Sequence, residues 1–209
     1  MSTEASSSPR RLHWVALVAL AVVAVVCATL ATAQHDRLAW LGYLNPLLVL
    51  GVLAVAYAPV RSRWSMAAAP VAAKLAMCVG VLMVTGKSEW AFYGALPFDL
   101  LALAIVSLLG YLVVGRTTRR DPVRVVATAG LAALAFFLVS NFGVWAVTSG
   151  GAEPMYARSL AGLATCYELG LPFLRMPLTA AVVMGAILFS PPALAVMTQR
   201  AATPAATTA

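Results

Sequence analysis

Long apolar runs with few charged residues recur along this 209-residue chain and restrict what it can fold into. Six runs reach the length of about 20 residues that a helix needs to cross the hydrocarbon core of a bilayer. Because lipid offers no partner to unpaired backbone groups, such runs must be helical. Only 10% of the residues are charged, against about 25% in soluble domains. We therefore predict an all-α integral membrane protein with six transmembrane helices. The expected spans are Trp14–Ala33, Tyr43–Val60, Met66–Thr85, Ala95–Val114, Val125–Val147 and Leu178–Met197.

The basic residues predict the orientation of these spans. Six crossings place nine arginines on the side of the termini and three basic residues on the other side. The positive-inside rule then makes both termini cytoplasmic. The inner set is Arg10, Arg11, Arg61, Arg63, Arg116, Arg119, Arg120, Arg124 and Arg200, and the outer set is Arg37, Lys87 and Arg158.

The expected organisation is a single transmembrane domain over residues 13–198. A polar cytoplasmic segment, 1–12, precedes it, and a low-complexity tail, 199–209, is expected to be disordered. The small residues at 31–33 resemble a signal-peptide cleavage site. The first apolar run exceeds the roughly 7–15 residues of a signal-peptide core, so a retained first helix is expected.

One further apolar run, Leu160–Leu174, has 15 residues, carries Glu168 and is bounded by Pro172 and Pro177. A run this short favours a capping or re-entrant helix before the last span. A seventh crossing stays open, because it would move only the C-terminus and Arg200 across the membrane.

Polar and aromatic side chains are unusually dense over Ser140–Pro177. Ionisable groups at membrane depth usually face the protein interior or a watery cavity. The candidate ligand-binding residues of an outward-facing pocket are Asn141, Trp145, Tyr156, Tyr167, Glu168 and Arg175. Two alternatives stay open. Asn141 can form an interhelical hydrogen bond, and Glu168 and Arg175, about two helical turns apart, can form an ion pair.

Lys74 lies within the third span, one turn before Cys78. It is a further ligand-binding candidate and can also pair with Asp99 or Glu168. A nearby cation would make the Cys78 thiol a better metal ligand. Asp99, just after Pro97, is expected to cap the fourth helix. In the first span, Ala24 and Ala28 form an AxxxA pair that allows close approach of a partner helix.

Enzyme motifs such as GxSxG, HExxH, a P-loop and GxGxxG are absent from the sequence. The three cysteines include no CxxC pair, and no basic face interleaved with aromatics suggests nucleic-acid binding. We therefore expect neither an enzyme nor a bound cofactor.

The C-terminal half, with FFLVSNFGVW over 136–145 and LAGLATCYELGLPFLR over 160–175, resembles a family of uncharacterised bacterial integral membrane proteins. That family resembles the substrate-binding S-components of energy-coupling factor (ECF) transporters. Its usual pattern reads SNFGVW, then LAGLxxCYxxxLPFFRN. Here Met176 replaces the usual Asn, and the last span lacks the usual Gly-Asp, so a polar role for that Asp does not transfer.

The resemblance implies a six-helix bundle in the bacterial inner membrane, with an outward-facing pocket. It also implies that the first helix contacts a transmembrane coupling subunit driven by ATPases. We accordingly expect capture of a vitamin or similar small molecule. A thiol such as Cys78 facing the pocket would favour a cobalt-containing ligand such as cobalamin. The alternative is a non-transporting accessory or scaffold subunit of a membrane complex.

Overall fold

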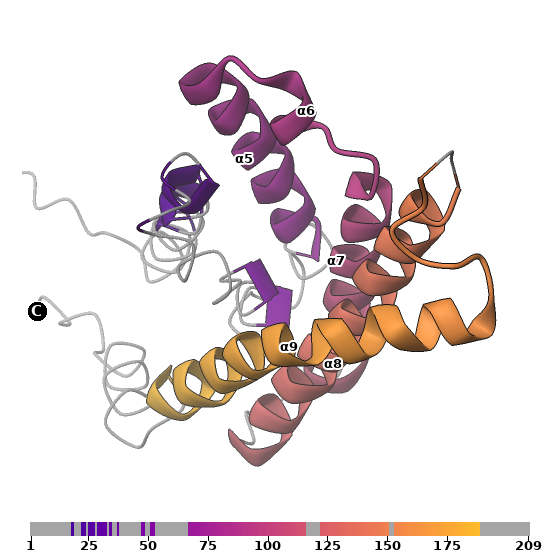
Figure 1. Ribbon diagram of the computed structural model, residues 1–209. Coiled ribbons are helices and arrows are strands. Elements are labelled where there is room, and N and C mark those ends of the chain that lie inside the picture. Colours follow the sequence, from indigo (N-terminus) through magenta and orange to yellow (C-terminus); the bar gives the residue numbers. More distant parts are fainter. Residues whose placement is uncertain are drawn as a thin grey trace, which may run out of the picture.

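The computed structural model describes residues 67–115, 122–150 and 153–188, together with residues 18, 22–23, 25–27, 29–32, 34, 37, 47–48 and 51–52. This part of the chain consists of helices and turns without a strand (Figure 1). The main helices are α5 (Ala69–Thr85), α6 (Ser88–Ala91), α7 (Leu96–Gly110), α8 (Pro122–Thr148) and α9 (Leu160–Leu188). A short π-helix, η2 (Tyr111–Gly115), continues α7. The AxxxA pair Ala24 and Ala28 and both terminal segments lie outside the described residues.

The helix ends follow the local sequence. α5 begins at a proline-containing first turn and ends at Gly86, whose φ of 68° places it in the left-handed region. The Gly86 N–H donates to the Leu82 carbonyl oxygen, which satisfies one of the last backbone acceptors of α5. α7 likewise begins with a proline, Pro97, in its first turn. The third, fourth and fifth predicted runs are therefore helices close to their expected bounds.

Consecutive long helices pack antiparallel. Lys74 of α5 meets Asp99 near the start of α7. As α9 proceeds from Cys166 to Leu178, its contacts on α8 move back from Asn141 to Gly130. Between α7 and α8, Gly143 lies directly against Phe98, so closely that a Cβ on residue 143 would overlap the phenyl side chain. The start of α7, the end of α8 and the start of α9 therefore lie at one end of the bundle.

The predicted break before the last span is wrong. α9 runs without interruption over 29 residues and contains both Pro172 and Pro177 (Figure 1). The expected capping or re-entrant helix is instead the first half of this helix. A proline within a helix removes one backbone hydrogen bond, and membrane helices tolerate that loss when neighbouring groups compensate for it.

The helices expose large apolar side chains on every element. Examples are Met83 (81% exposed) on α5, Leu101 (52%) on α7, Leu131 (56%) on α8 and Phe173 (52%) on α9. Within the described residues, two stretches are long and apolar enough to cross a membrane, Ser88–Val113 and Val123–Thr148. Water would penalise so much exposed apolar surface, whereas lipid tails would not.

Candidate functional site

A cluster of four side chains joins α5, α7 and the connection between them. Lys74 Nζ lies 3.4 Å from Asp99 Oδ2, and the two side chains are only 11% and 14% exposed. The Tyr93 hydroxyl donates to the same carboxylate oxygen. Lys74 Nζ also lies 5.3 Å from the centroid of the Tyr93 ring. The fourth member, Cys78, is fully buried one turn along α5 from Lys74. We call these four residues the Lys74 cluster.

The Lys74 cluster confirms one of the pairings expected for Lys74 and corrects the role expected for Asp99. α7 has no side-chain cap at its N-terminus, where Ala95 occupies the cap position. Asp99 instead accepts from Tyr93 and pairs with Lys74. A buried carboxylate without partners is costly, so the nearby cation and hydroxyl draw Asp99 away from the backbone amides.

The metal site expected at Cys78 has no set of further ligands among the described residues. Within the described part of the chain, no three His, Cys, Asp or Glu side chains gather closely enough to hold a metal ion. The ammonium group of Lys74 acts on the Cys78 thiol electrostatically, and a cation in that position would also repel a bound metal ion.

A second group of polar and aromatic residues joins α8 to α9 and to the loop between them. The Tyr167 hydroxyl donates to the Leu138 carbonyl oxygen at 2.9 Å. Cys166 Sγ lies 3.4 Å from the carbonyl oxygen of Asn141. Asn141 Nδ2 donates to Phe137, one turn back in the same helix, at 2.9 Å. These residues, with Trp145 and Tyr156, form what we call the α8–α9 seam.

Small residues allow the two helices of the seam to approach closely. A Cβ on Gly170 would lie 2.6 Å from Asn141 Oδ1 and 3.0 Å from the Phe137 ring. Only glycine fits at that distance. Asn141 therefore takes the role of a packing residue at the α8–α9 contact, and its amide donates to its own helix rather than across to α9.

The loop after α8 is tied to the seam by two aromatic residues. Trp145 Nε1 donates to the Ala157 carbonyl oxygen at 3.1 Å. The Tyr156 side chain lies close enough to Cys166 for the thiol to influence its phenol. Burial, and then the proximity of Cys166, raises the pKa of the Tyr156 phenol above its usual range. The neutral phenol is therefore the form that the folded loop favours.

Aromatic rings connect the Lys74 cluster with the seam. Phe98, next to Asp99 in the sequence, packs edge-to-face on Phe142 at 5.9 Å between ring centroids. Phe142 in turn lies 5.6 Å from Trp145. The two polar groups thus occupy the same end of the bundle, where α7 begins and α8 ends.

The remaining candidates, Glu168 and Arg175, lie elsewhere. Both are exposed on α9 and do not join the Lys74 cluster or the seam hydrogen bonds. The expected ion pair between them is absent, since the ion pair within the described residues joins Lys74 to Asp99. Two turns of uninterrupted helix hold the two residues about 10 Å apart along the axis.

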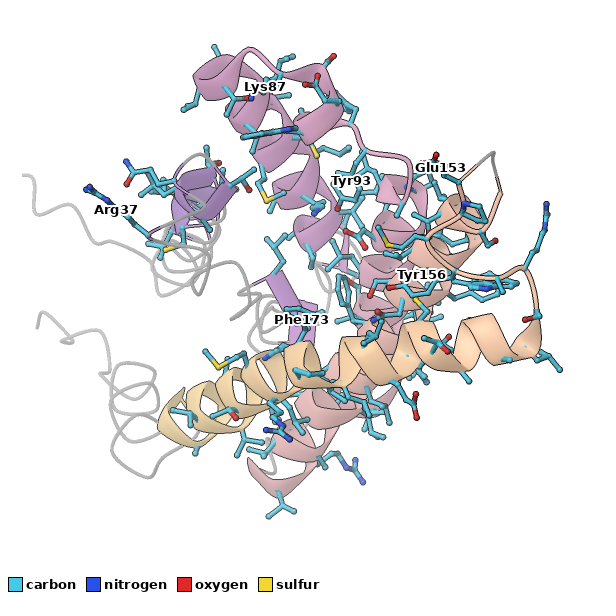
Figure 2. All side chains as sticks on the ribbon, viewed as in Figure 1. Arg37, Lys87, Tyr93, Glu153, Tyr156 and Phe173 are labelled. Carbon is cyan, nitrogen blue, oxygen red and sulfur yellow. The ribbon has the colours of Figure 1, made fainter. Side chains whose placement is uncertain are left out.

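Tyr93, Phe98 and Gly170 were not among the residues expected at the site from the sequence. Tyr93 lies between α5 and α7 (Figure 2), and a tyrosine six residues before an Asp in an apolar run was the available signal. Phe98 and Gly170 matter only through the register of neighbouring helices. No pattern in the local sequence indicates that register.

An apolar groove of about 380 Å³ lies between the first turns of α5 and the second half of α7, and no member of the Lys74 cluster lines it. Its one hydroxyl, on Ser107, donates to the Leu103 carbonyl oxygen at 2.9 Å, so it offers little polar recognition. The lining residues are Ala67, Ala68, Val71, Ala72, Leu75, Ala104, Ser107 and Leu108.

Comparison with known proteins gives one match. Residues 9–205 match a family described as a family of unknown function (DUF6580). No curated protein and no solved structure matches the chain.

Proposed function

We propose that this chain, which belongs to the DUF6580 family, is a substrate-binding subunit of the bacterial inner membrane. In this proposal it is S-component-like and captures a vitamin or similar small molecule at the outer end of a six-helix bundle. Both termini are cytoplasmic, and a transmembrane coupling subunit with ATPases supplies the energy.

The membrane location rests on the exposed apolar surface. The helices are apolar around most of their circumference, and large side chains on all of them remain uncovered. A helix that is apolar all round belongs in a protein core or in a membrane. Here many of those side chains are not in a core, so lipid is the environment that suits them.

The single observation that carries ligand capture is the Lys74 cluster. Two oppositely charged side chains lie within apolar helices, and a tyrosine in the connection between these helices donates to the carboxylate. Such a pair is weak support for stability, because desolvation offsets most of the attraction. Ionisable groups at this depth are typical of ligand and ion sites. A ligand with a carboxylate or amino group can exchange with one member of the pair.

The alternative, an accessory or scaffold subunit, is favoured by the seam. Tyr167 and Trp145 have hydrogen-bond partners between the helices or in the loop, and Asn141 has one in its own helix. These bonds account for the three residues without any ligand. We therefore place ligand recognition on Lys74, Tyr93 and Asp99, with the seam residues shaping the same end of the bundle.

Native mass spectrometry of the gently purified full chain tests this proposal. We expect a co-purifying small molecule at stoichiometric occupancy. It should be lost in the double variant Lys74→Gln/Asp99→Asn, which removes both charges together and leaves neither unpaired. The matched control, Lys87→Gln, removes an exposed lysine that stacks on Trp90 at the far tip of α5 and α6 (Figure 2). A chain that carries only lipids, or an adduct that survives in the double variant, contradicts ligand capture at this cluster.

A further inference from the structure

One face of α9 has the residue spacing of a helix-packing surface but is exposed. Side chains spaced alternately three and four residues apart form a stripe that is small or polar: Ala161, Thr165, Glu168, Pro172, Arg175 and Thr179. The buried residues Gly162, Cys166 and Gly170 lie on the opposite side, against α8. This spacing keeps one line of residues facing a neighbouring helix. We call the exposed line the α9 stripe.

The charges of the α9 stripe lie deep in the expected membrane. The contacts of α9 with α8 place Glu168 just beyond the level of Leu138, and Arg175 shortly before the level of Gly130. The middle of the candidate span Val123–Thr148 falls between these two levels. Each charge is then within about 6 Å of the middle of that span, by the rise of 1.5 Å per residue. Lipid tails are a poor environment for either charge.

Among the residues that the structure describes, neither Glu168 nor Arg175 forms an ion pair. The stripe hydroxyls of Thr165 and Thr179 donate to carbonyl oxygens of α9, so they are already satisfied. Lys74 is paired with Asp99. The first two apolar runs, Trp14–Ala33 and Tyr43–Val60, contain no charged residue.

A second copy of the chain fits poorly for a geometric reason. Two copies inserted in the same direction are related by an axis along the membrane normal, which presents the same surface from both sides. The stripes would then place Glu168 against Glu168 and Arg175 against Arg175. Like charges in a low-dielectric environment repel strongly.

We propose that the α9 stripe docks a transmembrane helix of a different polypeptide. That helix carries a basic residue level with Glu168 and a carboxylate level with Arg175. Small residues between the two allow close approach over Pro172, as in other membrane helix pairs. The inference rests on the membrane location in the proposed function, but not on ligand capture. The proposed docking surface is a different one from the AxxxA pair expected to contact a partner in the first helix.

Defined peptides test the docking. The full chain, labelled with a donor fluorophore, is reconstituted in phosphatidylcholine vesicles with acceptor-labelled Leu/Ala transmembrane peptides. One peptide carries Arg and Glu seven residues apart, and its control carries Gln at both positions. We expect the charged peptide to bind at least tenfold more tightly. That advantage should disappear in Glu168→Gln/Arg175→Gln and persist in Lys87→Gln.

Three results overturn the inference. The first is equal binding of the two peptides. The second is an advantage that survives in the double variant. The third is self-association of the chain that is lost in Glu168→Gln, which makes a second copy the occupant. Carbonate washing of the membranes distinguishes a failure of the docking proposal from a failure of the membrane proposal. A chain released by carbonate is not integral to the membrane, whereas a retained chain without peptide preference refutes the docking alone.

Discussion

The close contact between α7 and α8 at Gly143 makes a sharp prediction about stability. A Cβ on residue 143 would lie 2.5 Å from Phe98 Cγ and 2.8 Å from its Cδ2, and closer still to its Cβ. Because Phe98 Cβ is bonded directly to the backbone of α7, it cannot rotate away. Gly143→Ala must therefore separate the two helices.

The expected magnitude follows from two opposing effects. Overpacking of this kind costs about 1–3 kcal/mol, and the upper part of that range applies because the clash involves an atom next to the backbone. Alanine improves helix propensity by about 1 kcal/mol over glycine. We expect a net loss of about 1–2 kcal/mol for Gly143→Ala. This loss reduces the ratio of folded to unfolded protein by roughly five- to thirtyfold.

Gly130→Ala is the matched control in the same helix. A Cβ there would lie 3.8 Å from Leu178 Cδ1, an ordinary van der Waals distance. This variant should be unchanged or more stable by up to about 1 kcal/mol. Both proteins are unfolded by SDS titration in mixed micelles, with tryptophan fluorescence as the signal. Equal midpoints for the two variants would refute the packing of Phe98 on Gly143.

Three further predictions concern polar contacts. Lys74→Met alone should destabilise the protein by about 3 kcal/mol or more, because Asp99 is left buried and unpaired. Lys74→Met/Asp99→Leu should recover most of that loss in the same titration. A double variant whose loss of stability equals the sum of the two single losses would contradict the pairing. Tyr167→Phe should cost about 1 kcal/mol by removing the hydrogen bond to Leu138, whereas an unchanged midpoint would show that the bond does not form. Burial, and then Cys166, raises the pKa of Tyr156. The contribution of this shift to stability is therefore complete below the ordinary tyrosine pKa of about 10 and is lost as the pH rises through the higher folded value. Wild-type stability should thus fall slightly more than that of Tyr156→Phe on alkaline titration, and parallel curves would show that folding does not raise this pKa.

The helices themselves were predictable because composition determines them. Val125–Val147 became α8, with bounds three residues earlier and one later, since an apolar run between charged connections leaves little choice. Pro172 and Pro177 misled the prediction for the opposite reason. In water a proline usually ends a helix, but packing against α8 on both sides of Pro172 keeps α9 continuous.

The candidate site was only partly predictable because its partners are distant in the sequence. Lys74 could be identified as an isolated charge within an apolar run, and its pairing with Asp99 was one of the alternatives expected for it. The choice between a cap and an ion pair for Asp99 depends on where Tyr93 and Lys74 lie, which the antiparallel register of α5 and α7 determines. For Glu168 and Arg175, a spacing of seven residues suggested an ion pair. The continuous helix exposes both charges instead.

The most direct test of ligand capture is an experimental density map of the gently purified protein in a lipid nanodisc. We expect non-protein density at the outer end of the bundle, in contact with Lys74, Tyr93 or Asp99. Protein side chains that fill this end completely, with the Lys74–Asp99 pair sealed from any ligand, would contradict ligand capture and leave the accessory subunit as the function.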